Sequence, residues 1–485
     1  MTGTQAQGLG RQVVDSLIWR TGSQIFAQIV AWTSTFLVIR MLDPTAYGLY
    51  AMTDSMIMLL ATFSGISFAN ALVRQETVTH DEIRKVFGLL IILNAGLAAI
   101  QFASASLVAT YYHQPMVAHL LRVQTLLYVA TPVISLATAL LSREMDFRKQ
   151  ALAHLVSALA GAGTALAGAL SGIGVWALVA APIAMVWTRA IVLAITARNI
   201  PMPSFRFSGL GHAISFGLTI TTSYIFWFLQ TQADVFIGGR SLDPHRLGIY
   251  TTSLFLAQML TAKFVPPIND IAFSAYARMG SDRDAVSRGF THAVRLIMTL
   301  VMPFYIGMAM TAGPLVYIIL GPQWHETAVV VTSLALVMPC MTLQIMCSPV
   351  TNAAGKPRLT AYSSMAGAVI MPLAFLYGVH EGPIGLARAW WIGFPLLTAF
   401  TLWISLPVIG ATLGQVGKAV WSPIPATLGM AASIMLVERI LPAEVAPLLH
   451  LAWMVAVGFA TYVLLTLIFA RGVVADIMAL IRRPA

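Results

Sequence analysis

The sequence predicts an all-α, polytopic membrane protein with about fourteen transmembrane helices, most of them grouped in two related halves. Of its 485 residues, 58% are hydrophobic and only 9% are charged. A soluble globular domain carries roughly 25% charged residues, so this chain cannot cover a water-exposed surface of its size. The same balance excludes a soluble enzyme, a disordered protein and a nucleic-acid-binding domain as the bulk of the chain.

The first half of the chain contains six apolar segments, each with the roughly 20 residues that crossing a bilayer requires. The first segment ends at Arg40, and the second follows Asp43-Pro44, a pair that starts turns. The fifth and sixth are separated only by the short turn 171–174. These six predicted spans are residues 17–39, 46–69, 86–110, 120–141, 151–171 and 174–197.

The second half repeats this pattern and adds two further spans. Its fifth and sixth spans are separated only by residues 380–383, and no loop is long enough to hold a soluble catalytic domain. The predicted domains are residues 1–205, 206–412 and a C-terminal helix pair, 413–485. The eight predicted spans are residues 210–232, 247–268, 290–312, 326–349, 359–378, 383–408, 420–437 and 446–470.

Lysine and arginine are distributed unevenly between the two sides of this arrangement. With the N-terminus in the cytoplasm, 22 of the 28 Lys and Arg residues fall on the inner side and six on the outer side. Membrane proteins concentrate these residues on the cytoplasmic side. We therefore expect both termini in the cytoplasm. The same bias accounts for the formal net charge of +10 without a nucleic-acid partner.

An internal repeat relates the two halves. Residues 40–50 (RMLDPTAYGLY) match residues 240–250 (RSLDPHRLGIY) at Arg, Leu, Asp, Pro, Gly and Tyr. Six spans separate the copies, so both face the same side, as in a parallel repeat whose substrate site lies where the halves meet. The motif predicts a tight outer turn, started by Asp-Pro and completed by Gly; the alternative is a direct role in binding or gating. The turn residues are Asp43, Pro44, Gly48, Asp243, Pro244 and Gly248.

Several segments resemble a known family of bacterial polysaccharide transporters. Ser16-x-x-Trp19 precedes a span that ends in Arg40-x-Leu42-x-Pro44-x-x-Tyr47-Gly48. In order and spacing, further segments are similar to the Wzx-type flippases of the multidrug/oligosaccharidyl-lipid/polysaccharide exporter superfamily. They are a basic loop at 141–149, a loop at 266–290, and two turns at 320–324 and 352–356.

The resemblance implies two six-helix lobes in a V, as in multidrug exporters of the superfamily, and two extra C-terminal helices. It implies a protein that is not an enzyme and needs no cofactor. Such a flippase moves undecaprenyl-pyrophosphate-linked oligosaccharide by alternating access, from the cytoplasmic to the periplasmic leaflet of the bacterial inner membrane, during lipopolysaccharide (O-antigen) or polysaccharide biosynthesis. The implied partners are the lipid bilayer, a polysaccharide polymerase and glycosyltransferases, and no nucleic acid.

A lipid-linked glycan needs cations for its phosphates and hydrogen-bonding groups for its sugars. Arg20 opens a polar stripe at four-residue spacing on span 1, and Lys263 lies near the inner end of span 8, a helix on which related lipid II flippases use cavity bases. The alternative is that both bases snorkel to the interface. The predicted substrate-binding set is Arg20, Gln24, Gln28, Asn70, Arg74 and Lys263.

Two carboxylates lie inside predicted spans, where a charge is costly and usually faces a cavity or a partner. Asp54 lies eight residues into span 2, and Asp234 lies near the outer end of span 7. Both are candidates for a proton or coupling-ion site. The alternative is a structural ion pair, with Arg40 or Arg240 as the base beside Asp234.

Two other functions compete with glycan flipping. A multidrug or cation antiporter of the same superfamily typically has twelve spans and an acidic or aromatic cavity. A membrane polymerase or ligase of lipid-linked glycan usually has a large periplasmic loop with catalytic Arg or His, which this chain lacks. The sequence predicts no metal site, because no His, Cys and Asp have ligand spacing. It has no glycine-rich phosphate loop, so ATP hydrolysis by this chain is not expected.

Overall fold

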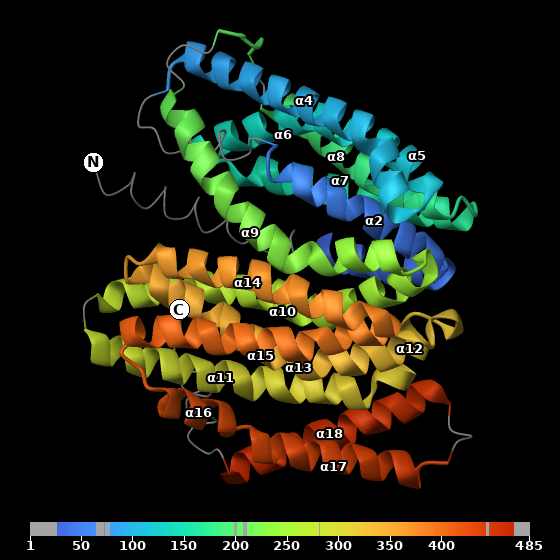
Figure 1. The fold of residues 1–485 in the computed structure, drawn as a ribbon, viewed down its shortest axis with the longest axis vertical. Coiled ribbons are helices and arrows are strands. Elements are labelled where there is room, and N and C mark those ends of the chain that lie inside the picture. Colours follow the sequence, from blue (N-terminus) through green and yellow to red (C-terminus); the bar gives the residue numbers. More distant parts are fainter. Residues whose placement is uncertain are drawn as a thin grey trace. The chain divides into compact units, whose positions relative to one another are not determined.

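The computed structural model describes residues 27–64, 72, 78–197, 201–206, 211–280, 282–442 and 446–469; of residues 211–224, 263, 264 and 469 it describes the backbone alone. Nearly all of this described chain is helical (Figure 1). It divides into two compact units, Met1–Phe228 and Leu229–Ala485. The boundary falls inside α9 (Gly211–Ser241), and each unit is described by itself.

The helices of the first unit pack both on the next helix of the chain and on the one after it. α7 lies against α8, α6 lies against α8, and α4 lies against both α5 and α6. The elements are the helix Ala27–Met41, α2 (Pro44–Ala61), α4 (His80–Tyr112), α5 (Pro115–Gln124), α6 (Leu126–Arg143), α7 (Phe147–Leu170) and α8 (Val175–Thr196).

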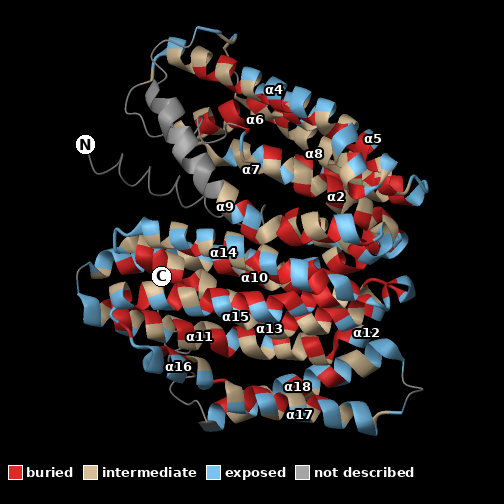
Figure 2. Ribbon diagram, in the orientation of Figure 1, coloured by how far each residue is buried: buried red, intermediate tan, exposed pale blue. Residues whose placement is uncertain are grey.

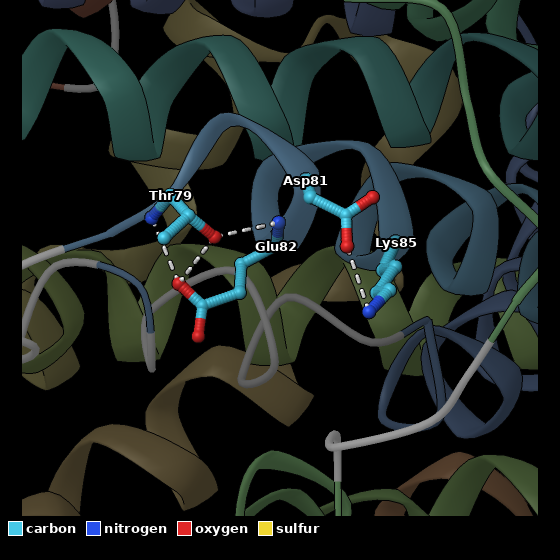
Figure 3. A network of polar contacts seen from close by, with 4 residues as sticks. All are labelled: Thr79, Asp81, Glu82 and Lys85. Carbon is cyan, nitrogen blue, oxygen red and sulfur yellow. Dashed lines mark hydrogen bonds and ion pairs between the residues drawn. The ribbon is translucent and has the colours of Figure 1, made fainter.

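Local polar residues determine where these apolar helices begin. At the start of α4, Thr79 Oγ1 accepts a hydrogen bond from the Glu82 amide at 3.2 Å, and Glu82 Oε2 accepts one from the Thr79 amide at 2.8 Å (Figure 3). This reciprocal capping box satisfies backbone donors that the helix itself cannot. Asp81 and Lys85, one turn apart, form an ion pair of 2.8 Å beside it.

The basic turn between α6 and α7 has a similar cap. Asp146 Oδ1 accepts a hydrogen bond from the Lys149 amide at 3.2 Å, and Lys149 Nζ lies 2.8 Å from Asp146 Oδ2. Partial burial by itself would raise the pKa of the Asp146 carboxyl. The hydrogen bonds from Lys149 and the charges of Lys149 and Arg148 outweigh burial and hold that pKa below its usual range.

The second unit is built around α13, which packs against α10, α11 and α15. α17 and α18 form a hairpin, and α17 also lies against α11. The elements are the remainder of α9, α10 (Pro244–Met279), α11 (Arg283–Met310), α12 (Ala312–Ile319), α13 (Thr327–Ala353), α14 (Pro357–Gly378), α15 (Gly382–Ile409), α16 (Leu413–Trp421), α17 (Ile424–Ile440) and α18 (Pro447–Phe469), with 3-10 turns at Pro322–Trp324 and Val379–Glu381.

The hairpin of α14 and α15 depends on close backbone approach. A side-chain carbon at Gly378 or Gly385 would overlap the carbonyl oxygen of the other glycine. Only hydrogen fits there, as at small-residue contacts between membrane helices. At the same end Arg388 on α15 forms a 2.7 Å ion pair with Glu381.

Many large apolar side chains of the described helices are exposed. Figure 2 marks the exposed positions along these helices in pale blue. Leu170 is 75% exposed, Trp403 73% and Phe459 69%. Contiguous apolar surface of this kind is not tolerated in water and matches a lipid-facing surface. Nine helices or continuous helical runs in the described chain are long and apolar enough to cross a bilayer.

Each of the fourteen predicted spans overlaps a helix of the structure, while the count of fourteen membrane crossings stays a prediction. The expected loop at 266–290 is wrong over most of its length, because α10 continues to Met279 and α11 begins at Arg283. The residues after Pro267 include Ala272, Ala275 and Ala277, and alanine is the strongest helix former. The division into domains at 205 and 412 also stays a prediction.

Candidate functional site

The two copies of the repeat have the same local structure. Asp43 has extended dihedral angles of −83° and 161°, and its Oδ1 accepts a hydrogen bond from the Ala46 amide at 2.9 Å. Asp243 has angles of −68° and 160°, and its Oδ1 accepts one from the Arg246 amide at 2.8 Å. Each aspartate caps a helix whose first residue is proline, a position where the missing N–H costs nothing.

The glycines of the repeat do not form the turn. Gly48 and Gly248 lie inside α2 and α10, are buried, and have no left-handed backbone. Each turn occupies only two residues, Leu42-Asp43 and Leu242-Asp243, and the aspartate side chain satisfies the helix start, so no glycine is needed there.

Asp234 lies in a buried polar network of the second unit. The carboxylate is 0% exposed, its Oδ2 accepts a hydrogen bond from the Tyr250 hydroxyl at 2.7 Å, and its Oδ1 accepts one from the Val235 amide at 2.8 Å. The Tyr250 oxygen in turn accepts a hydrogen bond from the indole N–H of Trp390 at 2.9 Å. One hydroxyl therefore joins α9, α10 and α15.

The surroundings of this network are apolar. Trp390 stacks on Phe394 with ring centroids 4.8 Å apart. The ring centroid of Phe375 lies 6.1 Å from that of Trp390, with the two rings tilted. Tyr250 itself is 0% exposed. In such surroundings an unsatisfied carboxylate or indole would be costly, so the three polar groups depend on one another.

Asp54 of the first unit has a looser environment. It is half-buried on α2, and the Tyr50 hydroxyl donates to its Oδ1 at 3.5 Å, the long limit of a hydrogen bond. Its neighbours Thr53 and Ser55 are buried and bond to backbone carbonyls of the same helix. Among the described residues no Lys or Arg forms an ion pair with Asp54.

Each half thus pairs the tyrosine of its repeat with a carboxylate, but from a different place. Tyr50 contacts Asp54 on its own helix, whereas Tyr250 contacts Asp234 on the preceding helix. The position 200 residues after Asp54 is Leu254, and the position 200 residues before Asp234 is Ser34. The repeat therefore preserves the tyrosine while the acid has changed helix.

Most residues of the predicted substrate-binding set lie outside the described residues. This applies to Arg20, Gln24, Asn70 and Arg74. Of the set, Gln28 is half-buried on the helix Ala27–Met41. Lys263 lies on α10, for which only the backbone is described at that position.

Helix geometry gives the distance of Lys263 from the start of α10. Lys263 lies nineteen residues after Pro244, about 28 Å along a helix that rises 1.5 Å per residue. That is close to the thickness of the hydrocarbon core, roughly 30 Å. Pro266 and Pro267 follow within the same helix, where they remove backbone hydrogen bonds and permit a bend.

Sequence reasoning missed a ladder of hydroxyl and amide groups in the second unit. Thr360 donates to the Asn352 carbonyl oxygen at 3.1 Å, and its hydroxyl also lies 3.3 Å from that of Ser348. Further along, Ser363 and Thr401 hydroxyls are 2.6 Å apart. Ser348, Thr351 and Asn352 at helical spacing inside an apolar segment were the available signal.

The described residues contain no cluster of three or more His, Cys, Asp or Glu that could hold a metal ion. What they offer instead is two carboxylate–tyrosine pairs. The pair Asp234–Tyr250 is buried, and the pair Asp54–Tyr50 is half-buried.

Comparison with known proteins gives one family match and two curated relatives. Residues 37–329, more than half of the chain, match the family described as "Polysaccharide biosynthesis protein". The succinoglycan biosynthesis transport protein ExoT of Rhizobium meliloti (strain 1021) is 26% identical over 358 residues, 73% of this chain and 72% of the relative. The lipopolysaccharide biosynthesis protein WzxC of Escherichia coli (strain K12) is 21% identical over 404 residues, 79% of each chain.

Solved structures with the same fold include a flippase and an exporter. Lipid II flippase MurJ in an inward closed conformation matches with a TM-score of 0.77 at 13% identity, covering 94% of this chain and all of the other. An inward-facing multidrug resistance MATE family transporter of the MOP superfamily matches with a TM-score of 0.61 at 12% identity, covering 78% of this chain and 94% of the other. At this identity the likeness establishes the fold alone.

Proposed function

The chain belongs to the polysaccharide biosynthesis protein family, and we propose that it is a flippase for lipid-linked oligosaccharide in the bacterial inner membrane. The family match over residues 37–329 is the observation that carries the proposal. One curated relative is named as a transport protein of succinoglycan biosynthesis and the other as a protein of lipopolysaccharide biosynthesis. The fold shared with a lipid II flippase supports the same activity.

The proposed cargo is an undecaprenyl-pyrophosphate-linked glycan, moved from the cytoplasmic to the periplasmic leaflet by alternating access. The bases Arg20 and Lys263 would bind the pyrophosphate in the cavity. Asn70 and Arg74 would receive the pyrophosphate on entry, and Gln24 and Gln28 would bind the sugars. Asp54 and Asp234 are the proposed coupling-ion or proton sites. Glycosyltransferases would supply the cargo, and a polysaccharide polymerase would consume it.

The predicted substrate-binding set is tested by measuring surface glycan in a strain from which the gene for this protein is deleted and each variant is supplied in its place. We expect Arg20→Ala and Lys263→Ala each to reduce surface glycan while the protein still accumulates in the membrane. Losing a charge-assisted contact costs roughly 1.5–3 kcal/mol, about one to two decades in affinity. Arg358→Ala, which removes an exposed base in the first turn of α14, is the matched control.

Three outcomes separate the possibilities. If charge alone matters, Arg20→Lys retains more function than Arg20→Ala. Normal surface glycan in the Arg20→Ala/Lys263→Ala double variant rejects the assignment of these bases. Normal surface glycan in the deletion strain, together with a loss of resistance to cationic drugs, favours the multidrug antiporter instead.

The proposed orientation puts both termini in the cytoplasm and the repeat turns in the periplasm. In a variant lacking Cys340 and Cys347, an impermeant thiol reagent added from outside should modify His245→Cys beside the second repeat turn. It should not modify Glu144→Cys between α6 and α7, although both positions are exposed. Modification of Glu144→Cys from the periplasm would overturn the arrangement of spans.

A further inference from the structure

A basic pocket of about 430 Å³ lies between α11 and α16 in the second unit. Figure 1 shows the short helix α16 beside α11. The described residues that line the pocket include no carboxylate. They are Arg288, Thr291, His292 and Arg295 from α11, and Gln415, Lys418, Ala419 and Ser422 from α16.

Helical spacing aligns the donors of both helices into facing stripes. Arg288 and Arg295 are seven residues apart on α11, two turns on one face, and Gln415, Lys418 and Ser422 follow at three and four residues on α16. The Arg295 guanidinium lies 3.3 Å from His292 Nδ1, a contact that orients it. Two guanidinium groups and one ammonium group therefore line the same pocket.

α16 is firmly seated on α11. Thr412 and Gln415 form a capping box at its start, with bonds of 2.8 and 3.3 Å. Val416 is 1% exposed and Ala419 6%, and both belong to the core cluster that includes Phe290 and Val294 of α11. The pocket is consequently a fixed feature of the fold.

The position of the pocket relates it to the membrane interface. The part of α11 without charged residues begins directly after Arg295, and the apolar helix α17 begins at Ile424, two residues after Ser422. On the third face of α16, Leu413 and Trp421 are each 66% exposed. Exposed tryptophan beside a basic helix is typical of the zone where headgroups meet acyl chains.

We propose that this pocket binds the phosphate group of an anionic phospholipid in the cytoplasmic leaflet. Arg288, Arg295 and Lys418 hold the phosphate, since guanidinium and ammonium groups donate to phosphate oxygens. Leu413 and Trp421 lie against the adjoining acyl chains. Basic pockets at the cytoplasmic ends of membrane helices recognise lipid headgroups in this way. The inference is independent of which glycan the protein moves.

The test is native mass spectrometry of the purified full-length protein, titrated with phosphatidylglycerol or with phosphatidylcholine of the same chains. We expect the wild-type protein to prefer phosphatidylglycerol, and Arg288→Gln/Lys418→Gln to bind it about tenfold more weakly or worse, because two charged donors are lost. Lys356→Gln/Arg358→Gln removes the same charge from exposed residues at the start of α14 and should bind as wild type.

Equal phosphatidylglycerol binding by the wild-type and Arg288→Gln/Lys418→Gln proteins, with unchanged size-exclusion profiles, would overturn the site. An equal loss in the Lys356→Gln/Arg358→Gln control would reduce the effect to net charge and also overturn it. Displacement of the lipid by inorganic phosphate at matched concentration would overturn the lipid as the source of the phosphate. Retained binding in Arg288→Lys/Lys418→Arg would support recognition by these charges.

Discussion

Replacing Tyr250 by phenylalanine removes one oxygen atom and breaks two buried hydrogen bonds. The Tyr250 hydroxyl donates to Asp234 at 2.7 Å and accepts from Trp390 at 2.9 Å, and Asp234 and Tyr250 are both 0% exposed. A stranded buried donor or acceptor costs about 1–3 kcal/mol, and more if charged. Two stranded groups therefore predict a loss of about 2–6 kcal/mol in the free energy of unfolding of the second unit.

The assay measures the thermal stability of the purified protein, monitored by size-exclusion chromatography after heating. Substitutions of two other tyrosines serve as matched controls. Tyr305 is also 0% exposed, but among the described residues its hydroxyl bonds to a single uncharged residue, through the amide and the hydroxyl of Thr261; Tyr377 is 77% exposed. We expect Tyr250→Phe to be the least stable, Tyr305→Phe intermediate and Tyr377→Phe equal to wild type. A Tyr250→Phe protein as stable as Tyr377→Phe would refute the claim that this hydroxyl holds α9, α10 and α15 together.

Two further predictions concern the acid of the first unit and the repeat turn. Asp54→Asn keeps the shape of the side chain but cannot change charge. We therefore expect the variant to express and to bind substrate but not to transport it. Full transport, measured as surface glycan, would remove Asp54 from the mechanism. Asp243→Ala should lower stability by about 0.5–2 kcal/mol, because the cap of α10 is lost. Asp243→Asn should not, because asparagine is a good capping residue. Thermal melts that show no difference between the two variants would contradict the capping role.

The class of protein and the positions of its helices could be predicted from the chain alone. Long apolar runs can be stabilised only in lipid or in a large interior, and each predicted run overlaps a helix. The structure of the repeat also depends on local contacts. Asp43 and Asp243 each cap the following helix by accepting a hydrogen bond from an amide three residues further along the chain. One boundary was wrong, because α10 continues through Pro266 and Pro267 to Met279, where a loop was expected.

The partners of the buried Asp234 came only from the tertiary structure. The sequence suggested an arginine near Asp234, yet its carboxylate is bonded by Tyr250, which also binds Trp390 across 140 residues of chain. Helical periodicity tells which face of a helix is polar but not which neighbouring helix meets that face. The basic pocket has the same origin, because Arg288 and Lys418 come together only when α16 packs on α11. The sequence alone determined that the helices lie in lipid and where several of them begin. Packing between helices that are distant in the chain determined the polar networks in the interior.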